Sequence, residues 1–262
     1  MESSLDISWL QLGLFSMILF IPLLINRYYQ LDMTKDVIIS AIRMLIQLVL
    51  VGLYLQYVFH LNNLIINISW IILMTLIGSS AIVNKVKLPH RLLFFPISCG
   101  LFWGLFPVLI LLCLVIIKPQ PFYSAQYIIP LAGMLLGNSL SSNIVAIQHL
   151  FEGFAQRTSE YEGAIALGAT PFQAAKPFSV EALKKSQAPI LATMTTMGLV
   201  TLPGMMTGQI LGGVDPIIAI KYQFVIIIAI FVMISVSLTL TLHLTLKRVL
   251  SDSGKIQTMP SV

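Results

Sequence analysis

Long runs of apolar residues, each about the length of a bilayer crossing, follow one another along nearly the whole chain. A hydrocarbon core of about 30 Å requires roughly 20 apolar residues in a helix. Seven runs reach or approach this length: residues 7–25, 37–59, 64–83, 92–117, 127–150, 189–211 and 216–246. The pattern predicts an all-α, polytopic membrane protein with about seven transmembrane helices, forming a single unit over residues 1–262.

The last two runs carry local signals of their own. Pro203-Gly204 interrupts the sixth run, and such breaks in membranes occur where the backbone is buried in protein or lines a cavity. The seventh run opens with Asp215-Pro216, an N-cap followed by proline at the first helical position. The chain starts with an acidic segment where a signal peptide would be basic, so the first run is expected to be a retained span.

Composition agrees with a membrane protein and excludes several other classes. Hydrophobic residues make up 57% of the chain and charged residues 10%, and the mean hydropathy is +0.93. A soluble domain is about a quarter charged, so this chain could not cover a water-facing surface. The net charge of +5 comes from basic residues scattered between apolar runs without stacking aromatics, which argues against nucleic-acid binding.

The placement of basic residues predicts the orientation. Twelve of the 15 Lys and Arg residues fall in one set of alternate loops, Lys118 and Lys221 fall in the other, and Arg43 lies inside a run. Cytoplasmic loops carry the excess of basic residues. We therefore expect an external N-terminus, a cytoplasmic tail over residues 247–262 and a cytoplasmic loop over about residues 151–188. Within that loop, residues 159–175 should form two short helices at an angle.

That loop contains Glu162-Gly163-Ala164, with Gly168 four residues further and Phe178 ten residues beyond Gly168. It resembles the coupling loop of ABC importer permeases, a Glu-Ala-Ala triplet followed by glycine, although Gly163 replaces the first alanine. Such a loop presents a short helix to a groove on a separate ATPase. The alternative is an ordinary amphipathic surface helix. The residues predicted to couple to the ATPase are Glu160, Glu162, Gly163, Ala164, Leu167, Gly168, Ala169, Thr170 and Pro171.

A wider set of segments occurs in a characteristic order: residues 41–48, 130–138, 167–171, 198–208, 215–216 and 219–223. The stretches Leu-Pro-Gly-Met-Met and Ile-Lys-Tyr-Gln within them are the most specific. Together they resemble the FetB family of ABC transporter permeases over most of the chain. The resemblance implies a cell-membrane permease that works with a FetA-type ATP-binding subunit in iron export and oxidative-stress resistance. Plant relatives are linked to aluminium tolerance, so the cargo of a given member stays open.

The chain has no Gly-x-x-x-x-Gly-Lys-Ser/Thr motif and hence no phosphate-binding loop of its own. We expect it to be a transport subunit and not an enzyme, to bind no cofactor, and to rely on ATP bound by a partner. A homodimer with two ATPase copies, exporting a metal ion such as iron, is the leading hypothesis. A gradient-driven transporter is the alternative, but none of the ten Asp and Glu residues falls well inside a span. A membrane-embedded enzyme would need paired aspartates or a nucleophile and base within the bilayer, and neither arrangement occurs.

Candidates for the substrate pathway are polar or irregular positions within the spans. Arg43 and Gln47 share a helix face, where the arginine could also reach the interface or pin a neighbouring helix. A polar stripe in the fifth run could line a pathway or form interhelical hydrogen bonds, and the broken sixth run could be a packed kink. Its methionines could bind a soft metal or only fill gaps. The stripe and the broken run contribute Asn138, Ser139, Ser142, Asn143, Thr201, Pro203, Gly204, Met205, Met206 and Gln209, and no metal ligand set is defined.

Overall fold

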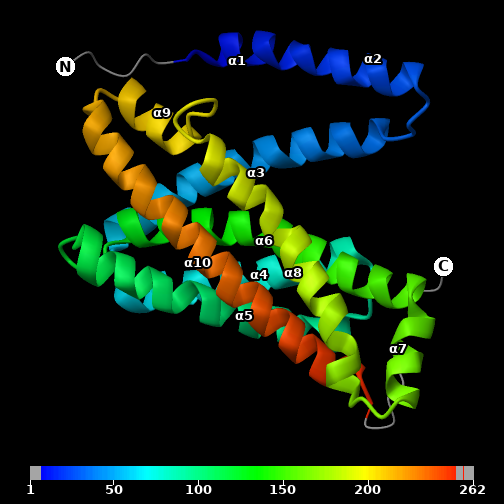
Figure 1. Ribbon diagram of the computed structural model, residues 1–262. Coiled ribbons are helices and arrows are strands. Elements are labelled where there is room, and N and C mark those ends of the chain that lie inside the picture. The colour runs from blue at the N-terminus through cyan, green and yellow to red at the C-terminus, as the bar shows by residue number, and fades with distance from the viewer. Residues whose placement is uncertain (1–6, 252–255, 257–262) are drawn as a thin grey trace.

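The computed structural model describes residues 7–251 and residue 256, and the chain is helical along most of this length (Figure 1). No β-strand forms within this part of the chain, where β-structure is limited to isolated bridges. The elements are α1 (Trp9–Ser16), η1 (Met17–Leu19), α2 (Phe20–Tyr28), α3 (Thr34–Leu61), α4 (Leu64–Val86), α5 (His90–Leu111), η2 (Leu112–Ile117), α6 (Ala125–Gln156), α7 (Thr158–Ala166), α8 (Pro171–Thr196), α9 (Gly204–Leu211) and α10 (Pro216–Val249).

Six of the helical stretches in the described residues are long and apolar enough to cross a membrane, which confirms the polytopic all-α class. Each coincides with one of the predicted runs. They are Trp9–Tyr28, Thr34–Leu61, Leu64–Val86, His90–Ile117, Ala125–Gln156 and Pro216–Val249. The N-cap prediction for the last of them is also confirmed, because the Asp215 side chain accepts hydrogen bonds from the backbone N–H groups of Ile217 and Ile218.

The predicted sixth span, residues 189–211, is not one helix. Helix α8 ends at Thr196, residues 197–203 are non-helical, and α9 begins at Gly204. Gly198 takes a left-handed conformation with φ +84°, and Pro203 holds the residue before it away from helical geometry. Figure 1 shows that α8 and α9 together still pass from the end of the bundle that holds α7 to the end where α10 starts.

Of the two short helices predicted over residues 159–175, the first is confirmed and the second is wrong. Helix α7 is short, but the second helix, α8, continues for 26 residues. Its start is fixed by a capping box in which Thr170 and Gln173 exchange side-chain hydrogen bonds with each other's backbone. The interior prolines Pro177 and Pro189 do not end the helix. The expected hydrophilic loop is therefore a helical projection with a tight turn at its tip.

The bundle is centred on α10, which packs against α5, α6, α8 and α9. Its closest partner is α5, where two glycines let the backbones approach. A Cβ atom added to Gly100 would lie 2.1 Å from Thr241 Oγ1 and 2.7 Å from the Ser237 carbonyl oxygen. One added to Gly104 would lie 3.0 Å from the Met233 carbonyl oxygen. Small residues at such crossings are the usual means of tight helix packing in membranes.

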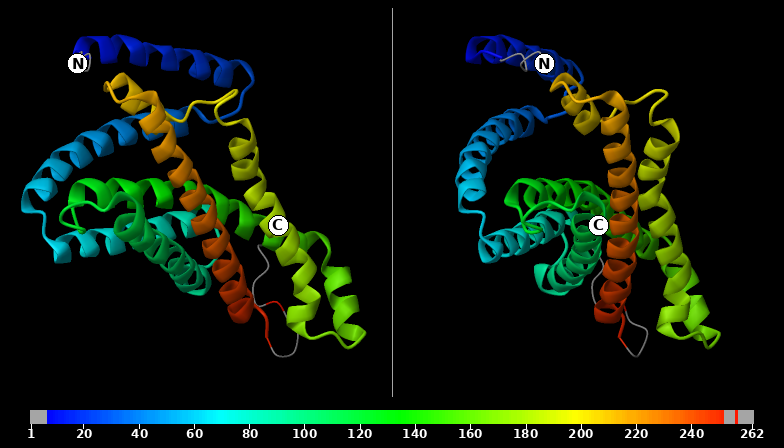
Figure 2. Two further views of the ribbon diagram at one scale, coloured as in Figure 1. Left: turned by 60° about the vertical axis from the view of Figure 1, so that its left-hand side comes forward. Right: turned by 90° about the vertical axis from the view of Figure 1, so that its left-hand side faces the viewer.

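The first three helices and η1 form an N-terminal hairpin, defined here as Trp9–Leu61, that stands apart from the bundle (Figure 2). It contacts the bundle near the end of α3, where Val58 packs with Ala125 and Ile129. The Tyr54 ring stacks on Trp70 there at 4.1 Å between centroids. Most of the remaining hairpin side chains are exposed, so the chain itself leaves this hydrophobic element largely uncovered.

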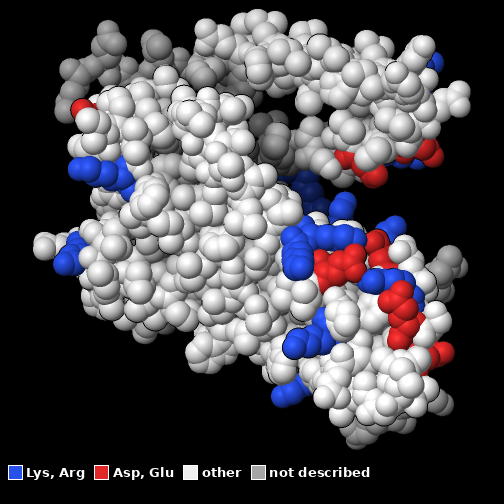
Figure 3. All heavy atoms as spheres, viewed as in Figure 1, with Lys and Arg blue, Asp and Glu red and all other residues white. Residues whose placement is uncertain are grey.

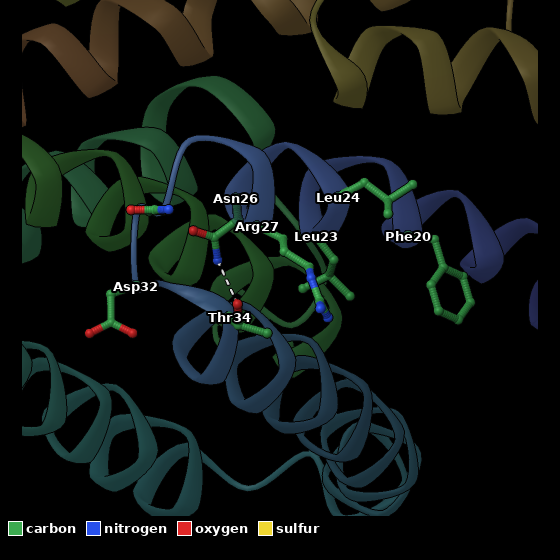
Figure 4. Close-up of a pocket in the computed structure, with 8 residues that line it drawn as sticks. Phe20, Leu23, Leu24, Asn26, Arg27, Asp32 and Thr34 are labelled. Carbon is green, nitrogen blue, oxygen red and sulfur yellow. Dashed lines mark hydrogen bonds between the residues drawn. The ribbon is translucent and has the colours of Figure 1, made fainter.

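The turn of the hairpin is closed by one buried amide. Asn26 Nδ2 donates to Thr34 Oγ1 at 2.9 Å, and Asn26 Oδ1 accepts from the Met33 backbone N–H at 3.3 Å. Beside it lies an open pocket of about 630 Å³ between α2 and α3, with Arg27 and Asp32 among its lining residues (Figure 4). The turn is thereby fixed by a local polar contact and not by the bundle.

The α5–α10 contact makes a direct prediction for stability. Gly100→Ala should destabilise the folded protein by about 1–3 kcal/mol, because the added methyl overpacks a contact whose neighbours include backbone. The matched control is Gly137→Ala, where a Cβ atom would meet nothing within 4 Å. Thermal unfolding of the purified protein in detergent measures both variants. An equal midpoint for the two would contradict the proposed contact.

Candidate functional site

Helix α7 is positioned by the residue that joins it to α6. Arg157 is both the C-cap of α6 and the N-cap of α7, so the two helices meet without a loop. At the other end, Gly168 adopts φ +93°, a conformation that glycine reaches without steric cost. Its N–H donates to the Ile165 carbonyl, and the Ala169 N–H donates to the Ala164 carbonyl. The chain thus reverses within four residues before α8 begins.

Three aromatic rings hold α7 against its neighbours. Phe154 of α6, Tyr161 of α7 and Phe178 of α8 are each at most 3% exposed. Ring centroids lie 5.5 Å apart for Phe154 and Tyr161, 4.9 Å for Phe154 and Phe178, and 6.5 Å for Tyr161 and Phe178. These distances suit favourable aromatic pairs. The three residues are called the α7 anchor below, since one ring comes from each of the three helices.

Charged side chains reinforce the anchor at its rim. The Arg157 guanidinium lies over the Phe178 ring at 4.8 Å and pairs with Glu181, while Lys185 pairs with Glu181 at 2.9 Å. Hydrogen bonds from Lys185 and Arg157 hold the pKa of the Glu181 carboxyl below its usual value. Because this pKa is lowered, the contribution of the ion pair is present at neutral pH and is lost only as pH falls through the lowered value.

The far side of α7 faces outward. Leu167 is 92% exposed at the tip, an unusual position for a large apolar side chain. Of the residues predicted to couple to an ATPase, Ala164, Ala169 and Pro171 are partly buried, and the exposed ones are Glu160, Glu162, Gly163, Leu167, Gly168 and Thr170. The sequence prediction missed the α7 anchor, because its rings lie on three different helices and no helical spacing along the chain relates them.

The predicted polar stripe on α6 divides into two faces. Ser139 and Asn143 are fully buried, and Asn143 Nδ2 donates to Ser139 Oγ at 3.0 Å and to Ser237 Oγ of α10 at 3.1 Å. This pair therefore ties α6 to α10. Asn138 is exposed and donates to the Met134 carbonyl, and Ser142 is partly buried. The structure thus favours interhelical hydrogen bonding for one half of the stripe.

The remaining pathway candidates lie in two separate places. Arg43 and Gln47 are exposed on α3 of the N-terminal hairpin, away from the α3 end that contacts the bundle. Around the link between α8 and α9, Thr201 accepts a hydrogen bond from the Gly198 N–H through its carbonyl. The other candidates in this region are Pro203, Gly204, Met205, Met206 and Gln209.

Of the α9 candidates, Met205 and Gln209 line a cavity between α6, α9 and α10. It has a volume of about 440 Å³, and its full lining is Ile117, Gln126, Tyr127, Pro130, Leu131, Met134, Met205, Gln209, Val214 and Tyr222. Gln209 Oε1 is buried and has no hydrogen-bond partner. An orphaned buried oxygen of this kind usually has an explanation in function, a bound ion or water. Met206, the next residue on α9, does not belong to the lining.

Charge is concentrated at one end of the molecule. Lys, Arg, Asp and Glu side chains gather at the end that holds α7 and the start of α8 (Figure 3). Within residues 7–251 and 256, the buried polar side chains are Asn, Gln, Ser and Thr. The same part of the chain holds no group of three or more His, Cys, Asp and Glu side chains that could bind a metal ion.

These features define a class: a multi-pass helical membrane protein with a charged helical projection at one end and an uncharged interior. The chain belongs to the uncharacterised protein family UPF0014, whose sequence model matches residues 9–250. This membership confirms the family resemblance expected from the ordered motifs. It also agrees with a multi-pass protein of the cell membrane.

Several named relatives are similar over most of their length. The membrane protein YjkA of Bacillus subtilis is 32% identical over 228 residues, covering 84% of this chain and 86% of YjkA. The Arabidopsis thaliana protein ALUMINUM SENSITIVE 3 is 31% identical, covering 80% of this chain and 75% of that protein. A protein of Escherichia coli K12 named "Probable iron export permease protein FetB" is 28% identical, with 82% of each chain covered. No solved structure matches the chain.

The α7 anchor gives a prediction that separates packing from hydrogen bonding. Tyr161 is 1% exposed and its hydroxyl has no hydrogen-bond partner. Tyr161→Phe should therefore leave the free energy of unfolding unchanged or raise it by up to about 1 kcal/mol. Tyr161→Ala should lower it by about 3–5 kcal/mol through the cavity left behind. Denaturant or thermal unfolding measures both, and a large loss with phenylalanine would show that the hydroxyl has a partner.

Proposed function

We propose that this chain is the membrane-spanning subunit of an ABC transporter that exports a metal ion, iron being the first cargo to test. In this proposal α7 docks on a separate, FetA-type cytoplasmic ATPase, which binds the ATP. The observation that carries the proposal is the projection itself: a short helix, anchored on its inner side, that presents Leu167 with 92% exposure. The name of the Escherichia coli relative supports the permease role and the iron cargo.

The packing around α7 suits the transmission of force. The Tyr161 ring of α7 packs against one ring of α6 and one ring of α8. A displacement of α7 therefore acts on both helices at once. Helix α8 is continuous for 26 residues and ends at the non-helical link 197–203. A rigid helix transmits displacement along its length, and the link is the place where that displacement can be taken up. The α9 wall of the cavity begins directly beyond this link.

The distribution of charged groups argues against a gradient-driven alternative. A proton- or sodium-coupled transporter places acidic side chains inside the bundle as ion sites. Among the described residues, the buried polar set contains amides and hydroxyls and no Asp or Glu. A transporter with this interior needs energy from outside the bilayer, and docking at α7 supplies a route for it.

The proposal includes two copies of the chain. In a single copy, the Arg43 side chain on α3 is exposed within an apolar helix, and a charge facing hydrocarbon is costly. A second copy packed against the N-terminal hairpin would cover both this charge and the apolar surface of α3. A particle mass equal to one chain in lipid nanodiscs at all protein concentrations would contradict the homodimer.

Docking at α7 is tested by association with a co-expressed FetA-type ATPase from the same organism. Leu167→Asn and Glu162→Lys should each weaken co-purification of the ATPase by about tenfold or more, since each changes an exposed α7 group without touching the α7 anchor. Gly168 is unsuitable for this test, because its φ of +93° would strain any other residue.

The matched control for this test is Glu152→Lys, which makes the same charge change on α6 at the same end of the molecule. Glu152 is exposed and pairs with His149 at 3.4 Å. Its substitution should leave ATPase binding unchanged. If Leu167→Asn and Glu162→Lys bind the ATPase as well as the wild type does, α7 is not the docking helix.

Orientation is tested by labelling two leucines of similar exposure. Leu167 on the α7 turn is 92% exposed and Leu199 on the α8–α9 link is 89% exposed. After the native cysteines are replaced, Leu167→Cys should react with a membrane-impermeant maleimide only when the cell is opened. Leu199→Cys should react in intact cells, because the bundle separates the two ends. Labelling of both positions from the same side would refute the topology.

A further inference from the structure

The cavity between α6, α9 and α10 has a donor set that limits what it can bind. Its lining side chains offer the thioethers of Met134 and Met205 and the amide of Gln209, together with the Gln126 amide and two tyrosines. The lining contains no carboxylate, imidazole, thiol or charged side chain. Met205 and Gln209 are four residues apart on α9, so they project from one face of that helix.

One buried oxygen at this cavity lacks a partner: Gln209 Oε1 is buried without a hydrogen bond. Gln126 and Pro130 of α6 also line the cavity, and a proline inside a helix has no N–H to donate to the carbonyl four residues earlier. A cation is a ligand that the Gln209 oxygen and the two thioethers could bind together.

The cavity lining has no anionic side chain, and this restricts the charge of a cation that could bind there. The cost of moving an ion out of water scales with the square of its charge, so it is about nine times larger for a trivalent than for a monovalent ion of equal size. Lys118 and Lys221, which adjoin lining residues in sequence, repel a cation in proportion to its charge. Thioethers add a preference for soft ions over hard ones. Together these effects favour a soft monovalent ion and disfavour bare Fe³⁺ or Al³⁺.

We infer that the cavity lined by Met134, Met205 and Gln209 is a binding site for a soft monovalent metal cation of the Cu⁺ or Ag⁺ type. The inference rests on the proposed function as a metal-ion exporter, and it replaces iron with a soft monovalent ion as the expected cargo of this cavity. Met134 and Met205 supply the sulfur ligands, from α6 and α9 respectively, and Gln209 supplies an oxygen. Because α9 follows the link at the end of α8, a movement of α8 would separate the two sulfurs and release the ion.

The test uses Ag⁺, which is stable to oxidation, in chloride-free buffer with the purified full chain in neutral-lipid nanodiscs. Cys99 and Cys113 are replaced by alanine because thiols also bind Ag⁺. Calorimetry should show one Ag⁺ site per chain in this background. Met134→Leu and Met205→Leu should each weaken it by about tenfold or more, and the double variant should abolish it. Leucine nearly conserves the volume of methionine, so the fold should be retained.

Met206→Leu is the matched control, since Met206 is adjacent on α9 but outside the cavity lining; it should bind Ag⁺ as the background does. If the cysteine-free chain does not fold, the comparison of native-cysteine chains with and without Met134→Leu/Met205→Leu gives the same difference. Equal Ag⁺ affinity in the double variant, or displacement of Ag⁺ by equimolar Fe³⁺ or Al³⁺, overturns the inference.

ATPase co-purification is measured on the same samples, so that the two proposals can fail separately. If the ATPase co-purifies while Ag⁺ binding is absent, only the inference about the cavity fails. If the wild-type chain binds no ATPase, the proposed function fails.

Discussion

The close contact between α5 and α10 is the constraint on which the arrangement of the bundle depends. With no side chain at Gly100, the two backbones approach until the glycine lies against Thr241 and Ser237. In a bilayer, helices gain little from burying apolar surface against one another, so association relies on packing density and polar contacts. Fixing α10 against α5 also places Ser237 where Asn143 of α6 can donate to it. One crossing thereby orders three helices.

Helix α8 connects the two regions that carry the proposed function, namely α7 at one end of the bundle and the α9 wall of the cavity at the other. In the first half of α8, Phe178 belongs to the α7 anchor, and Glu181 forms ion pairs with Arg157 and Lys185. At its end, the chain leaves helical geometry at residues 197–203 and re-enters it as α9, which forms one wall of the cavity. A stiff element between a docking helix and a hinged wall is the arrangement that couples an external motor to a binding site. The irregular link lies at the end of the bundle (Figure 1).

The sequence predicted the features that depend on local chemistry. Apolar length predicted six of the spans, and the Asp215-Pro216 pair predicted the start of α10. The continuity of α8 was missed, because Lys184, Lys185 and two prolines gave the segment the composition of a loop. Its tertiary partners are the anchor rings and Arg157, which pairs with Glu181. Of the candidate pathway residues, only Met205 and Gln209 reach the cavity. Motif order could not reveal this, since the facing residue Met134 is about 70 positions away in the chain and meets them only through the fold.

The placement of charge in this molecule is consistent with a separation of energy input from cargo binding. Ionised groups at the α7 end can remain hydrated, so they can be exchanged for contacts with a soluble partner at small cost. The buried polar side chains of the described residues are amides and hydroxyls, and the cavity adds thioethers. These groups stay in one protonation state across the physiological range. Among the described residues, the buried polar side chains include no carboxylate that could take up and release a proton. In the proposed transport cycle, affinity for a cation would then change through geometry, by the distance between donors on α6 and α9. The energy for that change would enter through α7, whose anchor joins it to α6 and α8.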